Sequence, residues 1–129
     1  MNDDARLWLK YARENREVAA MSLERQLFNP CLQNTQQAVE KSLKSVLIAG
    51  ETAIVRTHSI RKLRDDVIRV GIDPGLSDDD CDLLDSIYLP SKYPVGSALP
   101  HFDPDISICR RCLALADTAI KVAALVVED

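Results

Sequence analysis

The sequence predicts an all-α fold, an antiparallel up-and-down bundle of four long helices plus one short helix in a single domain of residues 1–129. Apolar residues recur with a period close to 3.6 through most of the chain, which indicates amphipathic helices. The core residues available are mainly Leu, Ala, Val and Ile, with only two Phe, three Tyr and one Trp. This composition is more typical of a helical bundle than of a β-sandwich, and 129 residues suit one domain.

The first two predicted helices cover residues 4–27 and 30–49. We expect Asn29 to end the first helix, because a residue before proline is disfavoured in the helical region. Pro30 is then well placed to open the second helix, and Gly50 to stop it. The apolar face of the first helix consists of Ala5, Trp8, Leu9, Ala12, Ala19, Leu23 and Leu27. That of the second consists of Leu32, Thr35, Val39, Leu43, Val46 and Leu47.

The third predicted helix has Ser59 as its N-cap and is closed by Gly71. A turn at "DPGLS" follows. Ser77 and the three aspartates after it then begin the fourth helix, which is short and should end before Pro90. Its inward residues are expected to be Cys81, Leu84, Ile87 and Tyr88.

The last predicted helix covers residues 104–127, with Asp103 as N-cap and Pro104 as first residue. It carries two apolar stripes. One contains Cys109, Cys112, Leu113, Ala116, Ala119, Ile120, Ala123 and Val127, and the other Ile108, Leu115, Val122 and Val126. A helix that is apolar on two sides must be covered on two sides. It is therefore central in the bundle or buries one face in a homodimer.

Cys109 and Cys112 form the only closely spaced pair among four cysteines. A structural zinc site needs two such pairs or accompanying histidines, whereas Cys31 and Cys81 are isolated. Since both thiols lie on an apolar stripe, we expect small buried core residues, with metal or redox chemistry as the alternative. We expect no metal and no cofactor.

The formal net charge of −4 argues against non-specific nucleic-acid binding, which needs clustered Lys and Arg. We therefore expect no DNA as a partner, although a local basic groove is compatible with this total. The N-terminal residues lack the apolar core of a signal peptide, and no apolar run approaches the length of a membrane span. A cytoplasmic protein without a membrane partner is expected.

A polar stripe follows the second helix at Gln33, Gln36, Gln37, Glu40, Lys41 and Lys44. Composition alone favours a solvated face with i, i+4 pairs such as Glu40–Lys44. His58 stands at the entry to the third helix, where it is either a capping histidine bonded to a carbonyl or carboxylate, or a polar group in a groove. The loop at residues 89–104, "LPSKYPVGSALPHFDP", offers Lys92, Tyr93 and His101 as candidates, or is a proline-rich connector.

No glycine-rich phosphate loop, nucleophile elbow or paired-histidine metal motif is present. At the same time, Trp8 and Ala12, the block "QQAVEKSLKSVL", the stretch "THSIRKL" and the stretch "YLPSKYP" occur in an order and at a spacing that resemble the HEPN family. The resemblance covers nearly the whole chain. It implies a bundle of four long helices and a shorter one, usually dimeric, often paired with a minimal nucleotidyltransferase in a toxin–antitoxin or nucleotide-handling unit.

The resemblance implies a ligand-binding set of Gln37, Glu40, Lys41, Lys44, His58, Lys92 and Tyr93. Many members of the family that this chain resembles look like metal-independent ribonucleases, with a signature of an Arg followed within a few residues by a His. Here Lys92 replaces the arginine of the family's "RYP", so a point charge replaces a bidentate fork, and His101 lies nine residues further on. If this chain cleaves RNA, His101 or His58 would polarise the 2′-hydroxyl and Lys92 would stabilise the phosphorane.

The residues and the resemblance together give three hypotheses for the function. The first is a dimeric domain that binds a nucleotide, or a nucleotidyltransferase partner, through a polar groove of the second helix, His58 and loop 90–103. The second is an endoribonuclease toxin that acts on RNA with a degenerate motif. The third is a scaffold that binds other proteins without a small ligand, with a homodimer interface on the last helix.

Overall fold

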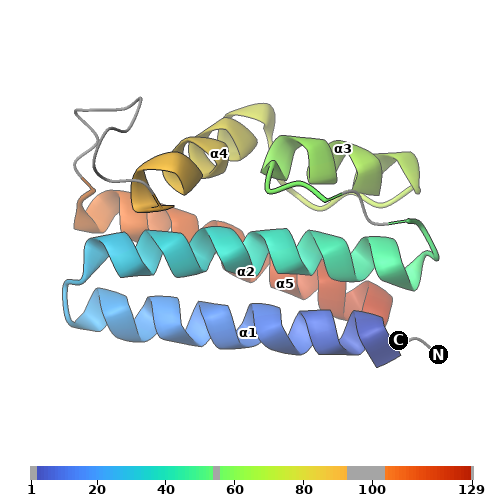
Figure 1. The fold of residues 1–129 in the computed structure, drawn as a ribbon, viewed down its shortest axis with the longest axis horizontal. Coiled ribbons are helices and arrows are strands. Elements are labelled where there is room, and N and C mark those ends of the chain that lie inside the picture. The colour runs from blue at the N-terminus through green and yellow to red at the C-terminus, as the bar shows by residue number, and fades with distance from the viewer. Residues whose placement is uncertain (1–2, 54–55, 93–103, 129) are drawn as a thin grey trace.

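The computed structural model describes residues 3–53, 56–92 and 104–128, and every regular element in these ranges is an α-helix. The helices are α1 (Asp3–Glu24), α2 (Phe28–Ala49), α3 (Ile60–Arg69), α4 (Asp78–Lys92) and α5 (Ile106–Val127). Helices α1, α2 and α5 run side by side with 22 residues each. The shorter α3 and α4 follow one another along the other side of α2 (Figure 1). The predicted all-α bundle is confirmed.

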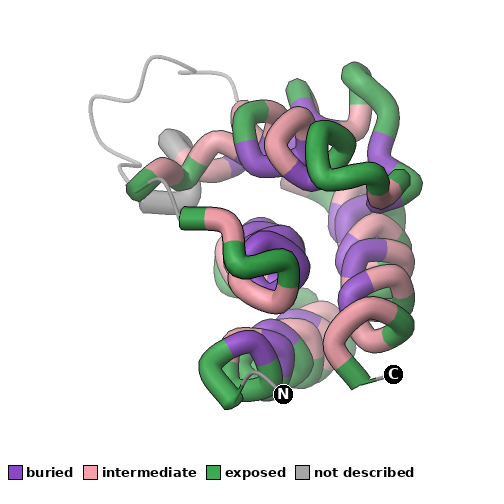
Figure 2. Tube along the Cα trace, turned by 90° about the vertical axis from the view of Figure 1, so that its right-hand side faces the viewer, coloured by how far each residue is buried: buried purple, intermediate pink, exposed green. Residues whose placement is uncertain are grey.

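Helix α2 is the central element, because it contacts each of the other four helices. Figure 2 shows it in the middle of the bundle, with other helices above it, below it and to its right. All six residues predicted to face inward from α2 are buried, and so are Gln36, Glu40 and Lys44 on its polar stripe. The expectation that this stripe is a solvated face is therefore wrong.

Helix α5 is less enclosed than α2. Its first stripe is buried at Cys109, Cys112, Ala116, Ala119 and Ala123. Its second stripe includes Ile108 and Val126, which are half-buried. The homodimer interface expected on this helix stays a prediction.

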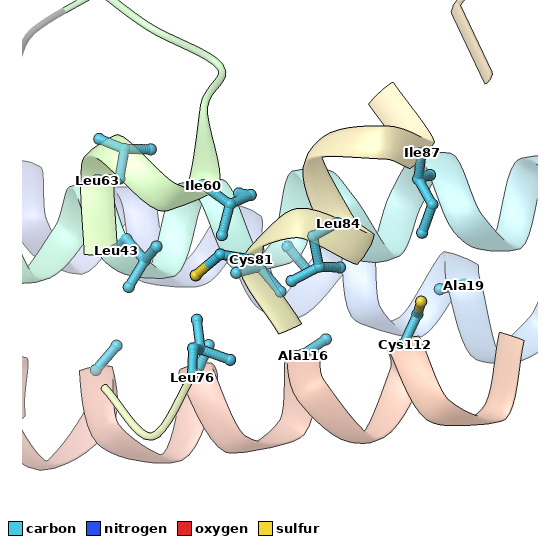
Figure 3. Packing of buried hydrophobic residues seen from close by; sticks show 14 of the residues in the cluster. Ala19, Leu43, Ile60, Leu63, Leu76, Cys81, Leu84, Ile87, Cys112 and Ala116 are labelled. Carbon is cyan, nitrogen blue, oxygen red and sulfur yellow. The ribbon is translucent and has the colours of Figure 1, made fainter. Parts of the chain in front are cut away.

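The core between the helix layers is aliphatic. Leu43 of α2, Ile60 and Leu63 of α3, and Leu84 of α4 are each at most 1% exposed. Figure 3 shows Leu84 above Ala116 of α5, and Leu43, Ile60 and Leu63 beside it, nearer Leu76. Burial of a leucine or isoleucine side chain stabilises a fold by about 1.5–3 kcal/mol, so this layer fixes α3 and α4 against α2.

The connection between α1 and α2 differs from the prediction. Helix α1 ends at Glu24, where the N–H of Leu27 donates to the Ser22 carbonyl (2.8 Å) and Gln26 has a φ of 58°. This is a Schellman closure with a non-glycine residue in the left-handed position. Helix α2 begins at Phe28, so Asn29 is helical and Pro30 occupies the first turn. Proline is tolerated there because N–H groups of the first turn have no intrahelical acceptor.

Two more helix ends follow the same pattern. After α2, the N–H of Thr52 donates to the Leu47 carbonyl (2.9 Å). Glu51 takes the left-handed φ of 58°, whereas Gly50, the predicted stop, has a φ of −82°. After α3, Gly71 has a φ of 90°, which glycine adopts at little cost.

The N-termini of α3 and α4 are capped by side chains, as predicted. The Ser59 hydroxyl accepts from the Lys62 N–H (3.2 Å), and Ser77 forms a reciprocal capping box with Asp80. In addition, Asp85 of α4 accepts from the N–H of Ile60 (2.6 Å). A carboxylate from a neighbouring helix therefore meets the positive end of the α3 dipole.

Two predicted boundaries near the long loop are wrong. Helix α4 continues through Pro90 to Lys92. Proline in the last turn of a helix costs only one N–H donor. The backbone can therefore stay helical for the two residues after Pro90. The N-cap of α5 is Asp105, whose side chain accepts from the Ile108 N–H (2.9 Å), instead of Asp103, which lies outside the described residues.

All four cysteines are free and buried, as expected for core residues. Burial raises the pKa of Cys81 to about 11 and the pKa values of Cys109 and Cys112 to about 12. These thiols are therefore neutral near pH 7. Within the described ranges, no group of three or more His, Cys, Asp or Glu side chains could hold a metal ion. None of the helices described is both long and apolar enough to cross a membrane.

Candidate functional site

One pocket of about 350 Å³ lies against the polar stripe of α2, and we call it the α2 pocket. Three structural units besides α2 contribute to its wall: α1, the entry to α3, and α4. Its lining residues are Trp8, Gln33, Gln36, Gln37, Glu40, Lys41, Lys44, His58 and Tyr88.

Glu40 is the organising group of the α2 pocket. Its side chain is only 9% exposed and accepts three hydrogen bonds. Oε1 accepts from Gln36 Nε2 (3.3 Å) and from His58 Nδ1 (3.0 Å), and Oε2 accepts from Lys44 Nζ (2.9 Å). A carboxylate with this many donors is well compensated for its burial, and it fixes the positions of His58 and Lys44.

His58 lies at the rim of the pocket, with 56% of its side chain exposed. Because an ionised carboxylate only accepts, the bond to Glu40 places the hydrogen of a neutral imidazole on Nδ1 and leaves Nε2 as an acceptor. The ring stacks on Tyr88 with centroids 4.8 Å apart and an interplanar angle of 16°. The backbone carbonyl of His58 also accepts a hydrogen bond from Gln36 Nε2 (3.3 Å). Glu40 and Tyr88 thus hold the imidazole in one orientation, and Gln36 holds the backbone of His58.

Lys44 is buried together with its carboxylate partner. Its Nζ lies 5.5 Å from the centroid of the Trp8 ring, a cation–π contact. Because Lys44 is held between Glu40 and Trp8, its charge is largely compensated within the protein. The i, i+4 pair of Glu40 and Lys44 that the sequence predicts is therefore confirmed as an ion pair of 2.9 Å.

Lys41 is the cation of the pocket without an anionic partner among the described residues. Its Nζ donates to Asn15 Oδ1 (2.7 Å) and lies 5.9 Å from the Tyr11 ring centroid. Asn15 in turn donates to Asn34 Oδ1 (3.0 Å). Neutral amides therefore position this ammonium group without cancelling its charge, and an anion can still gain from it.

Gln33 and Gln37 lie one turn apart on α2, and both are half-buried in the pocket wall. Their carboxamides make no hydrogen bond within the described part of the chain. Each carries two donors and one acceptor. Like Nε2 of His58, these carboxamides therefore remain available to a ligand.

The structure brings five of the predicted site residues together in this pocket: Gln37, Glu40, Lys41, Lys44 and His58. Lys92 is the last residue of α4, and its side chain lies outside the described part. Tyr93 and His101 also lie outside the described residues. The expected roles of Lys92 and His101 in RNA cleavage therefore stay predictions. The same holds for the expected roles of Lys92 and Tyr93 in ligand binding.

Sequence reasoning missed Trp8 and Tyr88 as pocket residues, because helical periodicity placed both on core faces. Each is half-buried, with one part packed and another lining the pocket. The signal was their amphipathic character, since Trp and Tyr favour boundaries between apolar and polar surroundings.

Comparison with known proteins identifies the family and supports the helical fold. A model of the HEPN domain matches residues 5–127. The crystal structure of TT1696 from Thermus thermophilus is similar, with 28% sequence identity and a TM-score of 0.77 over 98% of this chain and 99% of that one. The structure of ST0689, an archaeal HEPN homologue, has 22% identity and a TM-score of 0.64, and the match covers 95% and 97% of the two chains. A comparison with curated proteins returned no match.

The family match covers every residue that lines the pocket, on α1, α2, the entry to α3 and α4. The similarity to ST0689 concerns the fold, and the family model concerns the sequence. With nearly the whole chain matched, this protein belongs to the HEPN domain family.

Proposed function

We propose that this chain binds a nucleotide in the α2 pocket. The observation that supports the proposal is the combination of groups in one cavity. An unneutralised ammonium at Lys41 suits a phosphate, and the free carboxamides of Gln33 and Gln37 suit the polar edge of a base. Aromatic rings at Trp8 and Tyr88 complete the wall. The volume of about 350 Å³ falls within the range of pockets for small organic ligands.

Glu40 and Lys44 have a supporting role in this proposal. They are nearly buried and bonded to each other, so a ligand gains little from either charge directly. Their effect is to hold His58 at the rim and Trp8 in the wall. The groups proposed to contact the nucleotide are Lys41, Gln33, Gln37 and the exposed edge of His58.

The test is a titration with nucleotides followed by calorimetry and by tryptophan fluorescence. Trp8 is the only tryptophan of the chain and lines the pocket, so its emission should change on binding. The informative variant is Lys41→Met, which removes the ammonium and keeps the aliphatic stem. The matched control is Lys121→Met, the same change at an exposed position of α5 that does not line the pocket.

We expect saturable binding that Lys41→Met weakens by about tenfold or more, the loss of one charge-assisted contact of about 1.4 kcal/mol. Lys121→Met should leave the affinity unchanged. A bound ligand at one hundred times its dissociation constant should also stabilise the fold by about 2.7 kcal/mol. The proposal fails if no nucleotide alters either signal, or if both lysine variants weaken binding equally.

A further inference from the structure

We propose that the α2 pocket selects a nucleoside monophosphate over the corresponding diphosphate and triphosphate. This inference rests on the proposed nucleotide binding and adds which charge state of nucleotide the site accepts. It follows from the charge of the pocket, from what lies beyond Lys41, and from the position of the free carboxamides.

The charge of the lining favours the nucleotide with the smallest negative charge. The ionised lining residues are Lys41, Lys44 and Glu40, which sum to +1 when His58 is neutral. Lys44 is directed to Glu40 at 2.9 Å, so the positive charge that a ligand meets is that of Lys41. A monophosphate ester carries about −1.5 to −2 charges at pH 7, of which one ammonium compensates a large part. The additional charges of a di- or triphosphate would find no further cation in the described lining.

The surface beyond Lys41 is apolar. A second cavity of about 310 Å³ adjoins the α2 pocket and shares Trp8 and Lys41 with it, and its other lining residues are Leu7 and Tyr11. A β- or γ-phosphate that extended past Lys41 in this direction would therefore lie against two aromatic rings and a leucine. Among the residues that the structure describes, no further cation lines this cavity.

The free carboxamides are placed for the base of the same nucleotide. Gln37 and Gln33 precede Lys41 on α2 by one and two turns, about 6 and 12 Å along the helix axis. This span is comparable to the length of one nucleotide from its phosphate to the far edge of its base. With the phosphate at Lys41, the base therefore reaches Gln33 and Gln37 within the α2 pocket, and a longer phosphate chain has to extend outward.

The experiment compares the mono-, di- and triphosphate of the same nucleoside in magnesium-free buffer, since Mg²⁺ would neutralise the longer phosphate chains. The free nucleoside and inorganic phosphate serve as reference ligands. We expect the monophosphate to bind at least about tenfold more tightly than the triphosphate, a difference of about 1.4 kcal/mol. If the triphosphate binds as tightly or more tightly, the selectivity is wrong while nucleotide binding stands. If none of the nucleotides binds, both proposals fail.

A gain-of-charge variant examines the cause of the selectivity. Leu7→Lys places a second ammonium in the adjoining cavity at a position that is 43% exposed, and it should raise triphosphate affinity and reduce the ratio between the two ligands. Val18→Lys makes the same kind of change elsewhere on the exposed face of α1, at a position that is 45% exposed, and should leave the ratio unchanged. An unchanged ratio in Leu7→Lys would overturn the argument from the missing cation.

Discussion

Glu40 and His58 lie 18 positions apart in the chain and are joined by a hydrogen bond of 3.0 Å between Oε1 and Nδ1. Through this bond the central helix determines the orientation of a residue that belongs to the entry of α3. The same carboxylate holds Lys44 at 2.9 Å. The candidate site is therefore built around a buried anion with three donors, and this arrangement has consequences for stability that can be measured.

The first prediction concerns the removal of that anion. Glu40→Gln leaves the buried ammonium of Lys44 without a counter-charge, and we expect a loss of about 3 kcal/mol in the free energy of unfolding. Urea denaturation measures this loss. The substitution Glu14→Gln, at an exposed helical position of α1, should change stability by less than about 0.5 kcal/mol.

The double variant Glu40→Gln/Lys44→Met separates charge from packing. Because it removes both ions, it should recover most of the stability lost in the single variant. If the double variant is as unstable as the single one, the loss arises from packing at Glu40 and not from an unpaired charge at Lys44.

The second prediction concerns stability at alkaline pH. Burial raises the pKa of Cys112 to about 12, whereas a thiol in an unfolded chain titrates near 8.5. Above about pH 8.5 the unfolded chain therefore loses this proton while the folded protein retains it, and stability falls as the pH rises. From pH 9 to pH 10 one such thiol should lower the free energy of unfolding by about 1 kcal/mol.

Cys112→Ala provides the measurement. The variant lacks this thiol but retains the titrating lysines and tyrosines, so the difference in slope between variant and wild type isolates Cys112. Urea midpoints at pH 8, 9 and 10 should fall less steeply in the variant. Parallel slopes would show that the thiol is not protected from ionisation in the folded protein.

The third prediction concerns the cap that α4 supplies to α3. Asp85 accepts from the N–H of Ile60 at 2.6 Å and from the N–H of Arg61 at 3.2 Å. Asp85→Ala removes both acceptors and an anion at a helix N-terminus, which should cost about 1–2 kcal/mol of stability. The control is Asp82→Ala, which breaks an exposed pair with Arg61 and should cost less than about 1 kcal/mol. Equal losses for the two variants would contradict a special role of Asp85.

The fourth prediction concerns the left-handed residues at helix ends. Glu51 has a φ of 58° and an exposed side chain, so Glu51→Gly relieves backbone strain without removing a packed group. We expect thermal denaturation to show a gain of about 0.5–1 kcal/mol. Gly71→Ala is the reciprocal change, since an added Cβ there meets no atom within 4 Å and the φ is 90°. It should destabilise the fold by a similar amount, and a loss of stability in Glu51→Gly would contradict this account.

The helices and most of their caps follow from local sequence signals. The period of 3.6 identifies the inward residues of α2, and Ser59 and Ser77 are recognisable N-caps. The Glu40–Lys44 contact follows from i, i+4 spacing. Each of these features depends on residues within one or two helical turns, which is the range over which a single sequence is informative.

The remaining features depend on tertiary contacts. Nothing in the local pattern of α2 indicates that four helices surround it, and its polar stripe therefore looked solvated. The Asp85 cap crosses 25 positions to reach Ile60. Trp8 and Tyr88 fit core periodicity equally well, and only the packing of α1 and α4 against α2 leaves part of each ring at the pocket. Gln26 and Glu51 take backbone conformations that sequence rules assign to glycine.

The central position of α2 also bears on how the protein can vary. The same helix supplies core residues such as Leu43 and Leu47 and pocket residues such as Gln37 and Lys41. A one-residue slip in its register would rotate the pocket groups by about 100° and the core groups with them. Insertions in α2 are therefore expected to abolish folding and the site together, whereas the binding preferences of the pocket can diverge only by substitution at positions such as Gln33, Gln37 and Lys41.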